Sequence, residues 1–250
     1  MSRVGVITQV RTGSTRLPGK VLMHVGGKTM LDHHLDRLEA AGLPVYVATT
    51  TSAADDPIVE LAEQRGVRWF RGSEDDVLSR FAGCADEYDL DTVVRVSSDC
   101  PLVDGELVRS AVDQFEQIAD PWCYLSNALE RTFPRGFDFE VFSTEALRYA
   151  DEHARSSAER EHVTPYLYAG PPGQMTLRNI AREPDRSQYR VTLDTPADLR
   201  LITKLIENHH MERHPVDDII ALLDSHPELV AINAHVVQKT VPPPPSPTRR

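Results

Sequence analysis

One short loop near the amino terminus concentrates positive charge. Arg11, Arg16 and Lys20 lie within ten residues, although the whole chain carries a formal net charge of −11. Gly13 and Gly19 lack a Cβ, so a ligand can approach the backbone closely. Arginine can bind phosphate oxygens bidentately, and lysine supplies a mobile point charge. These residue types predict a loop that binds a triphosphate.

Further residues of the same loop support this prediction. Gln9 opens the segment, and Ser14 and Thr15 add hydroxyl and amide donors. The loop has neither the GxxxxGK pattern of a P-loop nor the GxGxxG pattern of a dinucleotide site. A solvated basic loop is the alternative interpretation. The candidate nucleotide-binding residues are Gln9, Arg11, Gly13, Ser14, Arg16 and Lys20.

Two aspartates follow predicted strands. Asp99 comes shortly after Thr92–Val96, and Asp194 comes directly after Tyr189–Leu193. Loops at the carboxyl ends of strands form the ligand crevice of a doubly wound sheet, where a carboxylate can hold Mg²⁺ on phosphates. The alternatives are an Asx turn for Asp99 and ordinary acidity at a helix start for Asp194. Helix acidity is the preferred interpretation of Asp198. The candidate catalytic residues are Arg11, Lys20, Asp99 and Asp194, with both aspartates as metal ligands.

A second group of residues is a candidate for acceptor binding. Asp138 and Glu140 share one face of a predicted strand, and Arg135 precedes them. Arg160 and His162 lie in the segment EREHVTPY and are suited to an acceptor carboxylate or a dimer interface. The alternatives are a solvated strand face for the first set and a capped helix with surface charges for the second.

Alternating strands and helices in the first half position these residues. Apolar, β-branched runs predict strands, and apolar residues at helical spacing predict helices. The predicted order is strand Val4–Val10, helix Met30–Ala41, strand Val45–Thr49, helix Pro57–Arg65, strand Val67–Phe70, helix Asp75–Tyr88, strand Thr92–Val96 and helix Gly105–Gln117. This order predicts an α/β fold with a doubly wound, mostly parallel sheet.

The second half is less regular and is expected to complete the same domain. Its predicted elements are strand Phe137–Phe142, helices Thr144–Glu152 and Ala158–Tyr168, strand Tyr189–Leu193, and helices Pro196–Asn208 and Val216–Asp224. Thr195 is the expected N-cap of the Pro196 helix. Four consecutive prolines begin a disordered tail at 241–250, so the nucleotidyltransferase domain is expected to span 1–240.

Composition limits the classes of function. The net charge of −11 argues against a general nucleic-acid binder. The sequence has no apolar run long enough for a membrane helix and no signal-peptide pattern, so a cytoplasmic protein is expected. Cys84, Cys100 and Cys123 are expected to be buried thiols, because no CxxC pair points to structural zinc and three cysteines do not form a disulfide framework.

The order of the basic loop, the SDCPL turn (98–102) and the LDTPADL turn (193–199) resembles the CMP-sugar synthetases. These are the acylneuraminate and 3-deoxy-manno-octulosonate cytidylyltransferases, and the chain is most similar to their spore-coat polysaccharide, SpsF-like branch. The resemblance extends over about residues 3–238. It implies the nucleotide-diphospho-sugar transferase fold, which is GT-A-like. It further implies that the triphosphate contacts Arg11, Arg16 and Lys20 and that Mg²⁺ is held by Asp99 and Asp194.

The predicted activity is Mg²⁺-dependent transfer of CMP from CTP to a sugar acid or related acceptor, with release of pyrophosphate. Alternatives are another NTP, a phosphate or phosphonate acceptor, a GT-A glycosyltransferase, or a non-catalytic nucleotide-binding protein. Better-characterised synthetases have glutamine and glycine where this chain has Ser97 and Ser98, which leaves the identity of the acceptor open. The expected partners are CTP and a small sugar-type acceptor, with neither nucleic acid nor membrane; a homodimer is left open.

Overall fold

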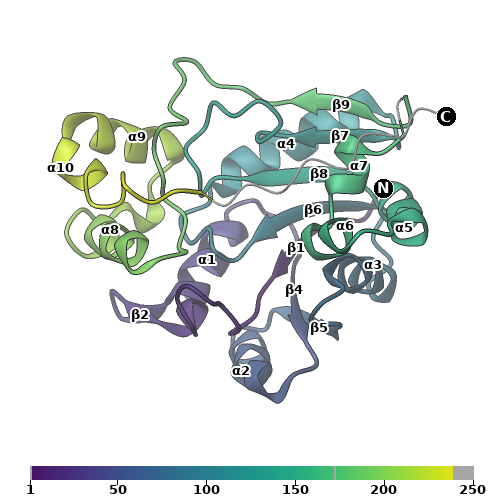
Figure 1. The fold of residues 1–250 in the computed structure, drawn as a ribbon, viewed down its shortest axis with the longest axis horizontal. Helices are drawn as coiled ribbons and strands as arrows, with labels where there is room; N and C mark the ends of the chain where they lie inside the picture. The colour runs from purple at the N-terminus through teal and green to yellow at the C-terminus, as the bar shows by residue number, and fades with distance from the viewer. Residues whose placement is uncertain (1, 172, 239–250) are drawn as a thin grey trace.

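Seven strands form the central sheet, in the order β5-β4-β1-β6-β8-β7-β9 (Figure 1). The computed structural model describes residues 2–171 and 173–238. The first four strands of the sheet pair in parallel, β8 runs antiparallel to β6 and β7, and β9 is parallel to β7. The predicted mostly parallel sheet is therefore confirmed. The strands are β1 (Val4–Gln9), β4 (Val45–Thr50), β5 (Arg68–Gly72), β6 (Thr92–Ser97), β7 (Cys123–Ser126), β8 (Phe139–Ser143) and β9 (Thr176–Asn179).

Helices cover both faces of the sheet (Figure 1). Neighbouring residues of a strand point to opposite faces, so Ile7 packs with α3 and α5 while Val6 packs with α1 and α4. The longer helices are α1 (Met30–Glu39), α2 (Asp56–Gln64), α3 (Val77–Glu87), α4 (Gly105–Ile118), α5 (Thr144–His153), α8 (Pro196–Glu207) and α9 (Val216–Ser225). Short helices are α6 (Ser157–His162), α7 (Pro165–Ala169) and α10 (Pro227–Val230), with 3₁₀ turns at Lys20–Leu22, Ala53–Asp55 and Met211–Arg213.

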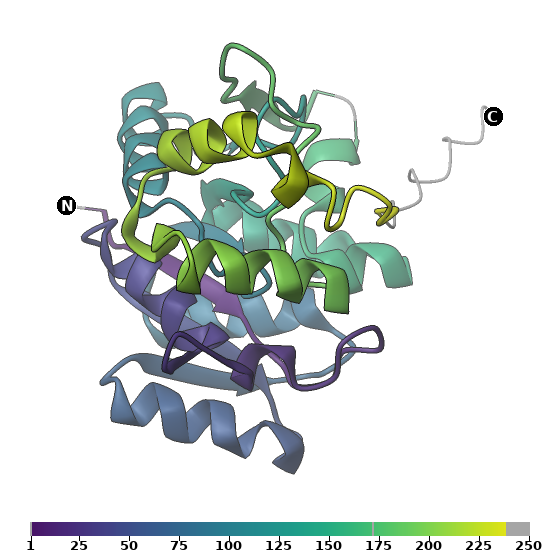
Figure 2. The same cartoon turned by 90° about the vertical axis from the view of Figure 1, so that its left-hand side faces the viewer.

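A separate apolar cluster joins α8 and α9 to one end of the sheet. Figure 2 shows these helices, in yellow-green, lying across the front of that end. Leu201 and Ile202 of α8 pack there with Phe137, which precedes the strand β8. Thr195 caps α8 as predicted, because its hydroxyl accepts from the Asp198 amide and the Asp198 carboxylate accepts from the Thr195 amide. The residues before α8 are thereby fixed against the sheet.

The structure corrects part of the predicted element list. Ala158–Tyr168 forms two short helices instead of one, because Val163 adopts a left-handed φ of 71° and Pro165 begins the second helix. Strands β7 and β9 were not predicted, nor was the small hairpin of β2 (His24–Val25) and β3 (Lys28–Thr29). These strands are only two to four residues long, too short for a periodic pattern to show.

The predicted strand Tyr189–Leu193 is also wrong. Among the described residues, this segment makes one isolated β-bridge, between Arg190 and Arg135, and no continuous strand pairing. It passes very close to Gly136, where an added Cβ would lie 2.6 Å from the Val191 carbonyl carbon and where φ is 106°. Position 136 therefore requires glycine. The segment lies beside Arg135 and the turn at Asp99 and does not join the sheet.

The predicted tail at 241–250 and the domain boundary at 240 lie outside the described residues. Within the described residues, no helix is both long and apolar enough to cross a membrane. Cys84, Cys100 and Cys123 are buried and free, as predicted. Burial raises the pKa of the Cys84 thiol to about 12, as expected for a cysteine that fills space in the core.

Candidate active site

Several of the predicted site residues line one cavity at the carboxyl end of β6. The cavity has a volume of about 640 Å³. Asp99 lies in the turn after β6, Asp194 lies just before α8, and the start of β8 forms the opposite wall. The predicted residues that line this cavity are Asp99, Arg135, Asp138, Glu140 and Asp194. Residues from distant parts of the sequence therefore meet in one place.

Lys20 lies between the two predicted metal ligands. Its Nζ donates to Asp194 Oδ1 at 2.8 Å and to the Leu193 carbonyl at 2.6 Å, and it lies 3.8 Å from Asp99 Oδ2. Arg16 Nη2 lies 3.1 Å from Asp194 Oδ2. Burial would raise the pKa of Asp194, but the charges of Lys20 and Arg16, together with Arg190, hold that pKa below its ordinary value. Two loop cations and both aspartates thus converge.

The other loop residues have different partners. Arg11 is exposed and lies 3.7 Å from Glu74 Oε1. Gln9 Oε1 accepts from Arg95 at 3.1 Å, and Ser14 Oγ accepts from the Leu17 amide at 3.4 Å. Nucleotide binding by Gln9, Arg11, Gly13, Ser14, Arg16 and Lys20 stays a prediction.

Asp55 anchors the basic loop, a role that sequence reasoning missed. Its carboxylate accepts from the Thr12 amide at 2.8 Å and from the Thr12 hydroxyl at 2.7 Å, and the Thr50 hydroxyl donates at 2.5 Å. Burial would raise the pKa of Asp55, but these hydrogen bonds outweigh burial and lower it. Although Asp55 directly precedes α2, its side chain makes no capping bond to that helix.

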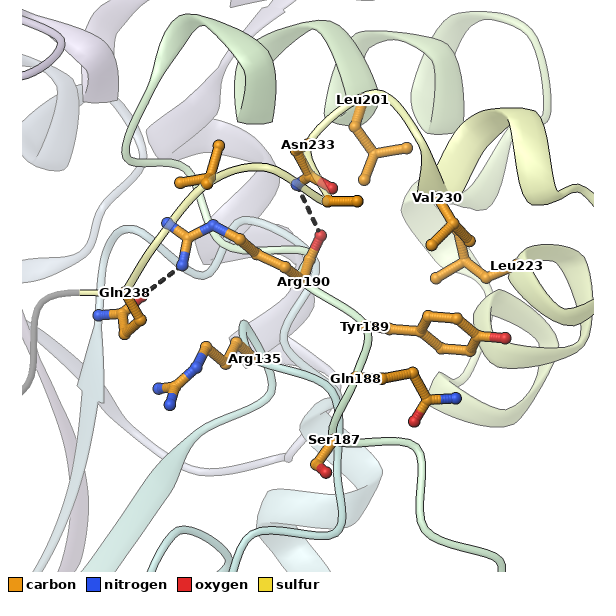
Figure 3. Close-up of a pocket in the computed structure, with 12 residues that line it drawn as sticks. Arg135, Ser187, Gln188, Tyr189, Arg190, Leu201, Leu223, Val230, Asn233 and Gln238 are labelled. Carbon is orange, nitrogen blue, oxygen red and sulfur yellow. Dashed lines mark hydrogen bonds between the residues drawn. The ribbon is translucent and has the colours of Figure 1, made fainter.

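Arg190 and Asp198 form a buried ion pair behind Asp194. Arg190 Nε donates to Asp198 Oδ1 at 2.8 Å, and Nη2 donates to Asp198 Oδ2 at 3.1 Å and to Asp194 Oδ2 at 3.0 Å. Asn233 donates to Asp198 at 2.8 Å and to the Arg190 carbonyl at 3.0 Å, a bond drawn in Figure 3. This network fixes one side of the Asp194 carboxylate. Asp198 therefore does more than provide helix acidity.

The wall opposite the aspartates consists largely of paired charges. Glu140 accepts from Arg95 and, at 2.9 Å, from the Tyr124 hydroxyl, while Asp138 binds both terminal guanidinium nitrogens of Arg131. Both carboxylates are thus paired with arginines, and acceptor binding by Asp138 and Glu140 stays a prediction. Within residues 2–171 and 173–238, the Arg135 guanidinium has no hydrogen bond or ion pair. Arg135 also faces the smaller cavity beside Arg190 in Figure 3.

Arg160 and His162 are not brought to this cavity. Arg160 Nε donates to Asp76 at 2.9 Å and Nη2 to Asp151 at 2.6 Å, which ties α6 to α3 and α5. His162 is half-buried at the end of α6, where burial lowers its pKa. Neither residue lines the cavity. The geometry favours the alternative of helix-surface charges for Arg160, and acceptor binding by this pair stays a prediction.

His34 supports the Asp99 turn from inside the core. Its Nδ1 donates to the Cys100 carbonyl at 2.8 Å, so in the neutral ring Nε2 accepts from the Thr8 hydroxyl at 2.8 Å. Burial lowers the pKa of His34 to about 4. The ring is thus held neutral, in one tautomer, between β1 and the turn.

This burial predicts that stability falls with acidification. In the unfolded chain His34 titrates near pH 6.5, as an exposed histidine does, so protons bind to the unfolded state first. The contribution of neutral His34 to the free energy of unfolding is present above pH 6.5. It is lost progressively as the pH falls toward 4, at up to about 1.4 kcal/mol per pH unit. Urea unfolding between these values measures the slope. His34→Gln should flatten the slope, whereas His153→Gln, at an exposed position, should not; equal slopes in all three proteins contradict the prediction.

Comparison with known proteins identifies the family. Residues 5–218 match the family described as "Cytidylyltransferase". The chain belongs to this cytidylyltransferase family. It is similar to a structure of a cytidylyltransferase from Leptospira borgpetersenii, with a TM-score of 0.88, 33% identity, and coverage of 96% of this chain and 100% of the other. The chain has the nucleotide-diphospho-sugar transferase fold.

Two relatives indicate the branch of the family. The cytidylyltransferase is 32% identical to the spore coat polysaccharide biosynthesis protein SpsF of Bacillus subtilis, over 91% of this chain and 97% of that one. It is 35% identical to the 3-deoxy-manno-octulosonate cytidylyltransferase of Hahella chejuensis, over 54% of this chain and 53% of that one. The predicted resemblance to CMP-sugar synthetases is confirmed, and the protein is a nucleotidyltransferase.

Proposed function

We propose that this cytidylyltransferase transfers CMP from CTP to a sugar acid or related acceptor and releases pyrophosphate. The contacts of Lys20 and Arg16 with two aspartates that line one cavity, Asp99 and Asp194, carry the proposal. The names of the relatives support CTP as donor and an acidic sugar as acceptor. An acceptor oxygen forms a bond to the α-phosphorus, the bond from that phosphorus to the bridging oxygen breaks, and pyrophosphate leaves with its electron pair.

The two aspartates fit a magnesium ion. Both contact the same Lys20 ammonium, so their oxygens point to one region. Among the described residues, no group of three or more His, Cys, Asp or Glu side chains could hold a metal. Mg²⁺ often binds through one or two carboxylates and takes its other ligands from water and phosphate. Bound there, Mg²⁺ would supply positive charge to the triphosphate and the leaving pyrophosphate.

Residues of the chain itself have two separate roles in this reaction. Arg16 and Lys20 offset the charge of the phosphates, which an acidic protein would otherwise repel. Asp194 is held by Arg190, so its carboxylate keeps one orientation through the reaction. No covalent intermediate is needed, because the acceptor attacks phosphorus directly.

The assay of the proposal is pyrophosphate release from each of the four NTPs with a panel of acceptors. We expect release with CTP and a sugar acid in the presence of Mg²⁺. Release with another NTP, or only with a phosphate or phosphonate acceptor, would replace the donor or acceptor assigned here. A GT-A glycosyltransferase needs a metal-binding DxD motif, and Asp89-Leu90-Asp91 instead precedes β6, where both aspartates bind Arg3.

The position of Arg135 in the cavity wall predicts that the acceptor is an anion. Arg135→Gln should raise the Michaelis constant for an acidic acceptor about 10- to 150-fold. This factor corresponds to the loss of one charge-assisted hydrogen bond, which contributes roughly 1.5–3 kcal/mol. Initial rates with a sugar acid and with its neutral amide measure the effect. The Michaelis constant for the neutral amide should change little, because a neutral group makes no ion pair with the Arg135 guanidinium. An equal effect on both acceptors would contradict a charge contact.

A further inference from the structure

Lys20 occupies the space that a metal ion between the aspartates would need. Its Nζ is 2.8 Å from Asp194 Oδ1 and 3.8 Å from Asp99 Oδ2, and its side chain is 11% exposed. An ammonium and a divalent cation compete for one carboxylate pair at such distances, because like charges only a few ångströms apart repel. The Lys20 ammonium therefore already supplies a cation at the aspartate pair.

Asp194 is surrounded by positive charge in this state. Arg16 and Arg190 lie 3.1 and 3.0 Å from its Oδ2, in addition to Lys20 at its Oδ1. A divalent cation approaching Asp194 would meet three positive groups around one carboxylate. An incoming triphosphate reverses this balance, since it brings several negative charges to the same place.

Of the two more deeply buried cations, Lys20 can leave the aspartates more readily than Arg190 can. Arg190 is locked by its two bonds to Asp198 and by burial. The Lys20 ammonium lies at the end of a flexible four-carbon side chain. Besides its contacts with the two aspartates, it donates to one backbone carbonyl, that of Leu193. Its backbone is fixed by the 3₁₀ turn that follows Gly19, so the ammonium can move while the loop stays in place.

We propose that Lys20 closes the Asp99–Asp194 pair to divalent cations until a nucleotide triphosphate draws its ammonium away. Metal binding is then conditional on the nucleotide, and the free enzyme does not bind the metal on its own. This inference rests on the proposed function, since it takes the two aspartates as the metal ligands. It adds an order of binding that the activity alone does not require.

Mn²⁺ binding without nucleotide, measured by calorimetry and electron paramagnetic resonance, tests the proposal. Lys20→Met should bind one Mn²⁺ at least about 10-fold more tightly than the wild type. Arg16→Met is the matched control: it removes one charge beside the same aspartate but leaves the pair closed, and should gain about 2-fold or less. A gain in Lys20→Met that Asp99→Asn abolishes places the ion at the pair.

Three outcomes would overturn the proposal: tight Mn²⁺ binding by the wild type, no gain in Lys20→Met, or equal gains in Lys20→Met and Arg16→Met. Lys20→Gln is a second variant in case Lys20→Met does not fold. In EDTA, Lys20→Met should also bind CTP about 10-fold more weakly, because the ammonium no longer meets the phosphates; unchanged affinity would overturn the second step. A wild type that does not bind CTP would instead overturn the proposed function, and the Mn²⁺ results would stand.

Discussion

Replacing Asp99 with asparagine lowers turnover by about 10²- to 10³-fold while the protein stays folded. That loss is typical of removing one group that stabilises the transition state. The Asp99 carboxylate is partly exposed and contacts Lys20 at 3.8 Å and the Cys100 thiol at 3.6 Å, so little packing depends on it. Its carbonyl, which binds the segment before α8, is retained in the variant. Pyrophosphate release at saturating CTP and Mg²⁺ is the measurement.

Asp113→Asn is the matched control for this experiment. Asp113 lies on α4 in an exposed i,i+4 pair with Arg109, so its amide should change neither turnover nor stability noticeably. Near-normal turnover in Asp99→Asn would remove Asp99 from the metal site. A large drop in melting temperature would instead show that the carboxylate has a structural role.

The largest loss of stability is expected from Asp198→Ala. Asp198 is fully buried, and its removal leaves the Arg190 guanidinium buried with Asp194 as its remaining charged partner. Breaking a buried pair by removing one partner costs about 3–5 kcal/mol. The variant also loses the capping box of α8 and the bond from Asn233. The free energy of unfolding in urea measures the cost.

Asp217→Ala provides the comparison for this variant. Asp217 is 77% exposed at its side chain and pairs with Arg182, and exposed pairs of this kind contribute about 0–1 kcal/mol. If Asp198→Ala unfolds with the same free energy as Asp217→Ala, the network around Arg190 does not hold this end of the sheet together.

The parallel half of the fold was predictable because its strands are buried on both faces. Val4–Gln9 and Thr92–Ser97 consist mainly of apolar and β-branched residues, and the helices between them carry clear apolar stripes. In the antiparallel half, β8 was predicted as Phe137–Phe142, but β7 and β9 gave no such signal. β9 contains two exposed residues among its four, and the segment at 189–193 makes a single bridge without pairing along its length.

The site was predictable as a set of motifs but not as a network. The alternation of strands and helices implies a parallel sheet whose strands end on the same side. Asp99 and the basic loop each follow such a strand, so they are expected to lie close together. The contact of Lys20 with Asp194 joins residues 174 positions apart, and no local pattern encodes it. The pairing of Arg131 with Asp138, a predicted acceptor-binding residue, likewise depends on side-chain geometry that appears only in the folded chain.

The Asp99 carbonyl accepts two hydrogen bonds, from the Leu193 amide at 2.7 Å and from the Thr192 hydroxyl at 3.0 Å. These bonds tie the backbone of Asp99 directly to the residues that precede Asp194, so the two proposed metal ligands are linked without the long stretch of chain between them. That stretch contains β7 and β8, which contribute Tyr124 and Glu140 to the cavity lining. Loops within it can change length or composition while the aspartates keep their separation. If the cavity receives the acceptor, as the proposed function requires, acceptor choice and phosphoryl chemistry can therefore be altered independently, by evolution or by engineering.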